Sequence, residues 1–153
     1  MNANNIESVV ARGESLWKSI YLPFETKLAE KLALSHPNLP VHIIQAHYGN
    51  LLSDPSPNMP GAKVGRVLTS IVAIASLRAQ TGVGPQVLSH IFGLRKAFED
   101  DSYKAEDEQD VEGGRWLASD EGSTWILNSI DAIVKAIGGS EGSNFAPVLK
   151  AKL

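Results

Sequence analysis

The sequence contains no cysteine among its 153 residues. Disulfides, thiolate nucleophiles and cysteine-ligated metals are therefore excluded. Every peroxidase mechanism that passes through a thiol is excluded for the same reason, because it needs one sulfur to attack the peroxide and a second to resolve the product. Any chemistry must use other side chains.

The sequence also has no long hydrophobic run and no excess of positive charge. Its longest apolar region, residues 67–77, is interrupted by hydroxyl-bearing residues and is too short to cross a bilayer. The first five residues lack the basic segment and apolar run of a secretory signal, so none is predicted. With 14 Lys and Arg against 17 Asp and Glu, the net charge of -3 gives no attraction to nucleic acid or anionic lipid. We therefore expect neither nucleic acid nor a membrane among the partners.

What is present is an ordinary globular composition arranged in helical patterns. Hydrophobic residues make up 43% and charged residues 20%, which fits one folded domain. The predicted fold class is all-α. Apolar residues recur at helical spacing, and the predicted helices cover residues 6–20, 23–34, 40–53, 62–80, 85–100 and 113–137. We expect one helical domain over residues 1–139 and a C-terminal tail over residues 140–153.

Several of these helices carry features that bear on the fold. Gly13 lies inside the first and should weaken it, because glycine has a low helix propensity. The helix over residues 62–80 is apolar around most of its circumference, which is typical of a helix buried inside a domain or at a subunit interface. The helix over residues 85–100 is amphipathic, and His90 falls about 70° from the centre of its apolar stripe. Ser119 or Asp120 can cap the last helix.

Two stretches suggest ligand loops at first sight. Residues 99–112 hold eight carboxylates against Lys104 alone, which is typical of a solvated surface loop. A calcium site is not predicted there, because the spacing lacks the central glycine and alternating ligands of an EF-hand. The turn over residues 81–84, Thr-Gly-Val-Gly, is not a phosphate loop, because it has no Lys-Ser or Lys-Thr and follows no strand.

Part of the chain resembles the AhpD-like, carboxymuconolactone decarboxylase superfamily, and fungal members in particular. The similar stretches are Arg66 to Ala75 and Thr81 to Ala97, with weaker similarity over Trp116 to Gly122. The resemblance implies a core of two antiparallel helices, joined by a short Gly-containing turn, with a histidine near the start of the second. It also implies a homo-oligomer, either a trimer or a hexamer. The apolar helix over residues 62–80 favours an oligomer independently.

The reactive residues of that family are largely absent here. Counting back from His90, the two cysteines typical of the family fall on Val83 and Gln86, and the upstream glutamate falls near Ile71. His90 is what remains of the usual set. The resemblance therefore implies proton transfer on a small unsaturated acid or lactone, and not thiol hydroperoxidase chemistry.

His90 is the first candidate catalytic residue, because a histidine at the edge of an apolar cleft can act as general acid or base near neutral pH. His47 is the second, if it points into a pocket whose other wall carries His90, and Tyr48 would then donate a hydrogen bond. Arg66 and Arg78 flank the apolar helix and are candidates for binding a substrate carboxylate bidentately. Each candidate has a structural alternative. For His90 it is a semi-buried histidine that hydrogen-bonds across the helix pair, for His47 and Tyr48 it is a surface histidine beside a packing tyrosine, and for the arginines it is ion pairs between helices or subunits.

No metal or other cofactor is predicted. His42 and His47 lie five residues apart, which corresponds to ~140° around an α-helix. The two side chains should therefore not share a face, as a pair of metal ligands must. His36 precedes Pro37 and is expected to be exposed at a helix end.

The sequence ends in Ala151-Lys152-Leu153, a conservative version of the Ser-Lys-Leu peroxisomal address. This ending predicts a peroxisomal import receptor as a partner and a peroxisomal location. The alternative is a cytoplasmic protein in which the tripeptide arises by chance.

Two functions follow from the residues and the resemblance. The first is a cysteine-free, carboxymuconolactone decarboxylase-like enzyme of the lyase type that uses His90 for acid–base chemistry on a small apolar acid or lactone. That chemistry covers decarboxylation, isomerisation and lactone reactions. The second is a non-catalytic oligomeric or ligand-binding scaffold of the same fold. A pocket between His90, His47 and Arg78 would favour the first function, and a closed, dry interface around His90 would favour the second.

Overall fold

Helices form all the regular structure in the computed structural model, which describes residues 2–55, 63–104 and 111–137. The predicted all-α class is therefore confirmed. Within these residues, no helix is both long and apolar enough to span a membrane. In chain order the elements are α1 (Ile6–Tyr21), α2 (Glu25–Ser35), α3 (Leu39–Val41), the π-helix η1 (His42–Leu52), α4 (Gly65–Gln80), α5 (Gly84–Glu99), the 3-10 helix η2 (Ser102–Lys104), α6 (Gly114–Leu117) and α7 (Asp120–Ala136).

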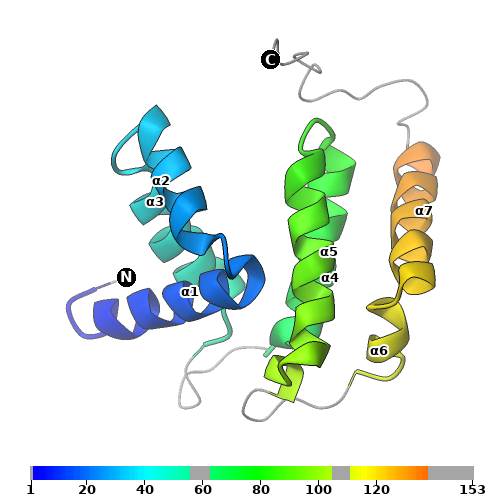
Figure 1. Ribbon diagram of the computed structural model, residues 1–153, viewed down its shortest axis with the longest axis horizontal. Coiled ribbons are helices and arrows are strands. Elements are labelled where there is room, and N and C mark those ends of the chain that lie inside the picture. The colour runs from blue at the N-terminus through cyan, green and yellow to red at the C-terminus, as the bar shows by residue number, and fades with distance from the viewer. Residues whose placement is uncertain (1, 56–62, 105–110, 138–153) are drawn as a thin grey trace.

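The pair α4 and α5 lies at the centre of the molecule, with α1 to η1 on one side and α6 and α7 on the other (Figure 1). The two central helices run antiparallel, as predicted, because the turn between them spans only residues 81–83. Apolar side chains of α4, α5 and α7 form one core cluster around Ile74, Leu94 and Ile126. Trp17, Ile20 and Tyr48 form a second cluster between α1 and η1.

The helix α1 crosses η1 with the two backbones in direct contact. A Cβ atom at Gly13 would lie 2.9 Å from the Cα of Gly49 and closer still to the carbonyl oxygen of Ile44. A Cβ atom at Gly49 would in turn lie against the backbone of Val9. The expectation that Gly13 only weakens its helix was therefore incomplete, because this glycine permits the close approach that packs α1 on η1.

The segment predicted as an α-helix over residues 40–53 is wound more widely than an α-helix. After the short α3 it continues as the π-helix η1, in which each N–H bonds to the carbonyl five residues earlier. The last of these bonds runs from Ser53 N–H to Tyr48 O at 2.9 Å. Tyr48 and Gly49 are the buried residues of this helix, and both belong to its contact with α1. The wider winding of η1 accompanies its contact with α1. The spacing of apolar residues within the segment therefore does not predict it.

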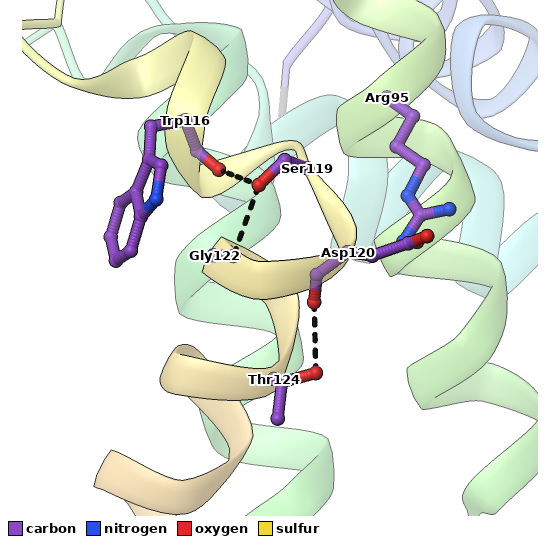
Figure 2. Close-up of polar contacts among 6 residues, drawn as sticks. All are labelled: Arg95, Trp116, Ser119, Asp120, Gly122 and Thr124. Atoms are coloured by element: carbon purple, nitrogen blue, oxygen red, sulfur yellow. Dashed lines mark hydrogen bonds and ion pairs between the residues drawn. The ribbon is translucent and has the colours of Figure 1, made fainter.

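The predicted last helix, residues 113–137, is broken into α6 and α7. The Ser119 hydroxyl ends the first by donating to Trp116 O at 2.7 Å and caps the second by accepting from Gly122 N–H at 3.1 Å (Figure 2). A side chain at Gly122 would collide with the backbone of Trp116. Of the two predicted caps, Ser119 is therefore the one used. Its neighbour Asp120 pairs with Arg95 of α5 at 2.5 Å.

Some sequence expectations fall outside the described residues. These are the structure of residues 105–110 in the acidic stretch and that of the tail with Ala151, Lys152 and Leu153.

The helix over residues 62–80 was expected to be buried on nearly all sides. Within a single chain, only one side of α4 is buried. Leu68 and Val72 remain 41% and 52% exposed, because α5 and α7 cover only part of its surface.

Replacing Gly13 by alanine is expected to lower the free energy of unfolding by about 1–3 kcal/mol, because backbone atoms cannot rotate away from the added methyl group. Gly84→Ala is the matched control. A Cβ atom there meets nothing within 4 Å, and the φ of Gly84 lies outside the left-handed region, so stability should stay level or rise by up to about 1 kcal/mol. Urea unfolding followed by circular dichroism measures both changes. Equal stabilities of the two variants would contradict the proposed role of the crossing.

Candidate functional site

His90, Tyr21 and Tyr48 meet where α1 passes between α5 and η1, and we call them the Tyr–His cluster. The two phenol oxygens lie 2.8 Å apart. The Nε2 atom of His90 lies 3.3 Å from the Tyr21 oxygen and 3.5 Å from the Tyr48 oxygen. Three elements therefore each supply one polar side chain to one interior point: the C-terminal residue of α1, the middle of η1 and the middle of α5.

Aromatic and charged side chains enclose this cluster. The ring of Trp17 lies with its centroid 4.2 Å from that of Tyr21 and 5.1 Å from that of Tyr48. The guanidinium of Arg66, on α4, is buried close enough to act electrostatically on both Tyr48 and His90. The site is therefore a polar cluster inside an otherwise apolar packing layer.

Burial controls the protonation of all three members. It lowers the pKa of His90 to about 4, and the positive charge of Arg66 acts in the same direction. Burial also raises the pKa of Tyr21, against the opposing effect of its hydrogen bond with Tyr48, and raises the pKa of Tyr48. The cluster therefore holds a neutral imidazole and two protonated phenols at neutral pH.

The cluster reaches the surface through Tyr21. This residue lines a cleft of about 380 Å³ between the C-terminal end of α1, the start of α2 and one face of α5, which we call the Tyr21 cleft. The other lining residues combine apolar side chains with a few polar and charged ones: Ile20, Leu22, Phe24, Leu28, Ser89, Phe92, Arg95, Lys96 and Glu99. His90 itself is only 4% exposed and is not one of them.

Two positively charged side chains, Arg95 and Lys96, line the Tyr21 cleft. Lys96 donates to the carbonyl oxygens of Ile20 and Leu22, so it also closes the C-terminal end of α1. Arg95 uses one terminal nitrogen to pair with Asp120, while its buried Nε–H has no hydrogen-bond partner among the described residues. These two side chains therefore place positive charge beside the apolar wall of the cleft.

Arg78 lies in a second cleft, on the far side of α4. This cleft has a volume of about 610 Å³ and is formed by the end of α4, the turn over residues 81–84 and α7. Arg78 holds Asp131 of α7 with two hydrogen bonds of 2.8 and 2.6 Å. Val83, where the resemblance places a cysteine, lines this cleft, but His90 does not. Neither of these two clefts, which are lined by described residues, brings His90, His47 and Arg78 together.

His47 also lies away from the Tyr–His cluster. It is exposed on η1, with its Nε2 atom 3.3 Å from the Nε2 atom of His42. The prediction that these two histidines do not share a face was wrong, because it assumed an α-helix and the segment is a π-helix. His36 is exposed at the end of α2, as expected.

Of the five predicted site residues, the structure brings together His90, Tyr48 and Arg66. Tyr21 is the member that the sequence reading missed. A signal for it was present, because Tyr21 follows Trp17 by four residues and so extends the buried face of the first helix by one turn. Its partners in the cluster lie 27 and 69 residues further along the chain.

Comparisons of the chain with protein-family models, with curated proteins and with solved structures give no match. The likeness to the AhpD-like superfamily therefore rests on the sequence stretches quoted above. The Tyr–His cluster and the cleft beside it are the features of the molecule that bear on its function.

The lowered pKa of His90 makes stability depend on pH. Unfolding returns the imidazole to its ordinary pKa of 6.5, so between pH 6.5 and about 4 the unfolded chain binds a proton that the folded chain does not. The contribution of the neutral His90 to the free energy of unfolding is therefore complete above pH 6.5 and is lost as the pH falls toward 4. We expect the stability difference between wild type and His90→Gln to shrink by about 3 kcal/mol between pH 7 and pH 4. Urea unfolding at stepped pH measures it, and parallel curves for the two proteins would contradict the prediction.

Proposed function

We propose that the protein carries out acid–base chemistry on a small apolar carboxylic acid or lactone bound in the Tyr21 cleft. One observation carries the proposal. Tyr21 lines the cleft, and its phenol is hydrogen-bonded to the buried Tyr48 and lies within hydrogen-bond distance of His90. A half-buried residue of the cleft wall is thus connected to a buried, hydrogen-bonded network, which is how enzymes hold a donor in a fixed geometry.

The chemistry of the cleft wall supports this substrate class. Most of its lining is apolar, and its volume of about 380 Å³ is in the range of small-molecule sites. Arg95, which lines the cleft, brings a positive charge that favours a carboxylate or a polarised lactone oxygen. Lys96 adds a second positive charge, and Glu99 at the same wall disfavours a dianionic ligand.

The role assigned to Tyr21 is to donate a hydrogen bond to an oxygen that gains negative charge. In decarboxylation of a 3-oxo acid, the bond to the carboxyl carbon breaks, carbon dioxide leaves, and the electron pair moves to the carbonyl oxygen as an enolate, which water then protonates. Isomerisation, once a base such as water has removed a proton from carbon, and lactone opening, once water has added to the carbonyl carbon, also place negative charge on an oxygen. The raised pKa of Tyr21 keeps its phenol protonated and therefore able to donate to that oxygen.

Tyr48 and His90 act through Tyr21 in this proposal. The Tyr48 phenol shares a hydrogen bond of 2.8 Å with Tyr21, and Nε2 of His90 lies within hydrogen-bond distance of both phenols. When Tyr21 donates to a substrate oxygen, its own oxygen accepts from Tyr48. An imidazole with a pKa of about 4 is a weak base, so His90 is a positioning residue here. The direct contact with substrate, first expected of His90, is assigned to Tyr21.

A second candidate function is an oligomeric scaffold, which the outer face of α4 supports. Leu68 and Val72 lie four residues apart on that face and are about half exposed, and Val64 precedes them by the same spacing. Trp125 and Ile133 on the neighbouring α7 are also more than half exposed. A second copy of the chain covering such a face would make the homo-oligomer that the sequence leads us to expect.

Tyr21→Phe tests the catalytic proposal. We would assay wild type on a 3-oxo acid, a β,γ-unsaturated acid and an unsaturated γ-lactone, and then measure kcat of the variant on whichever is turned over. Removing the hydroxyl is expected to lower kcat by about 100- to 1000-fold, as loss of a donor to a developing oxyanion does. Tyr103→Phe, on η2 and stacked on Phe98, is the matched control and should leave kcat unchanged. Full activity of Tyr21→Phe would overturn the proposal, and no turnover of any of the three would favour the scaffold.

Leu68→Lys combined with Val72→Lys tests the oligomer. We expect wild type to elute as a trimer or hexamer in size-exclusion chromatography with light scattering, and the double variant to fall to the monomer mass, because charges on a covered apolar face resist burial. Leu34→Lys, at a fully exposed position of α2, should leave the mass unchanged. A monomeric wild type would rule out the oligomeric scaffold.

A further inference from the structure

We propose that His42 and His47 form a binding site for a single divalent transition-metal ion that prefers tetrahedral ligands, such as Zn²⁺. The site lies on the exposed face of η1 and is independent of the proposed function. Both side chains are exposed, so an ion reaches them directly from solvent.

The spacing of the two imidazoles fits one shared ion. Their Nε2 atoms lie 3.3 Å apart, and the two rings are nearly perpendicular at 81° with centroids 5.0 Å apart. Two histidine nitrogens at the usual zinc distance of about 2.0–2.1 Å, separated by a tetrahedral angle, lie about 3.3–3.4 Å from each other. The same nitrogens in adjacent corners of a square would lie only about 2.8–3.0 Å apart. The observed spacing therefore favours a tetrahedral ion over a square-planar one.

The winding of η1 creates this pair. In an α-helix, five residues turn the second side chain ~140° away from the first, and the two imidazoles cannot meet. In the π-helix each N–H bonds five residues back, as the bond from Ser53 N–H to Tyr48 O demonstrates, so each residue turns the chain through a smaller angle than in an α-helix. Five residues therefore carry His47 only a little past one full turn from His42, and the two imidazoles meet on one face. A π-helical segment is rare, and segments of this kind occur frequently at functional sites.

The site supplies two protein ligands, and water completes the coordination. Among the described residues, no third His, Asp or Glu lies close enough to form a three-ligand group. Open positions are typical of metal sites that bind an external ligand, whereas structural zinc sites are closed by four protein ligands. Tyr48, the next residue, is buried in the Tyr–His cluster, whereas the ion would lie on the exposed face of η1 and outside that cluster.

The test uses the full chain without a histidine tag and ZnCl₂ as the only added metal. Isothermal titration is expected to give one Zn²⁺ per chain. His42→Gln and His47→Gln should each weaken binding by about tenfold or more, because loss of a direct ligand costs at least as much as loss of an outer-shell partner. His36→Gln removes another exposed histidine, which interacts with Asn38 N–H and not with a second imidazole, and should leave the affinity unchanged. Helical circular dichroism spectra check that all three variants fold.

Co²⁺ in place of Zn²⁺ reports the geometry directly, because a tetrahedral Co²⁺ complex has intense visible absorption and an octahedral one does not. We expect that absorption in wild type and its loss in His42→Gln and in His47→Gln. The proposal is overturned if Zn²⁺ binds wild type no more tightly than either variant. The contact between the two rings would then be a histidine–histidine hydrogen bond only.

Discussion

The buried guanidinium of Arg66 is the interaction on which the arrangement of the molecule depends. A buried charge must be fully hydrogen-bonded to be tolerated, and Arg66 meets this demand with partners on three helices. It donates to Ser19 of α1, Ser70 of α4 and the carbonyl oxygen of Gly93 of α5. These bonds hold the C-terminal half of α1 against the central helix pair and so bring its last residue beside His90. The same charge adds to the effect of burial in disfavouring protonation of the imidazole, so this side chain acts on both the geometry and the charge of the cluster.

Much of the fold could be predicted because it follows from local rules. Apolar spacing and the Pro- and Gly-rich breaks place the helices to within a few residues, and the Ser119 hydroxyl caps α7 as its residue type predicts. The π-helical winding of η1 could not be predicted in this way. It accompanies a crossing in which Gly13 meets Gly49, 36 residues further along the chain, and the apolar spacing within η1 is equally compatible with an α-helix.

The candidate site was only partly predictable, for a related reason. His90, Tyr48 and Arg66 carry the right chemistry, and the structure does bring them together. Arg78 carries the same chemistry as Arg66, but it lies on the opposite side of α4 and pairs with Asp131. Twelve residues separate the two arginines along the same helix, and their surroundings decide which one enters the interior: Arg66 bonds to α1 and α5, whereas Arg78 pairs with α7.

The crossing of α1 over η1 has one more consequence. Where side chains separate two helices, their spacing adjusts as rotamers change. At this crossing peptide backbone touches peptide backbone, so the spacing is set by the atomic radii of groups that have no rotamers. Tyr21 lies two turns beyond that contact on the same rigid helix. Its hydroxyl is therefore held against that of Tyr48 before any ligand arrives, and the network is preorganised by two residues that have no side chain at all.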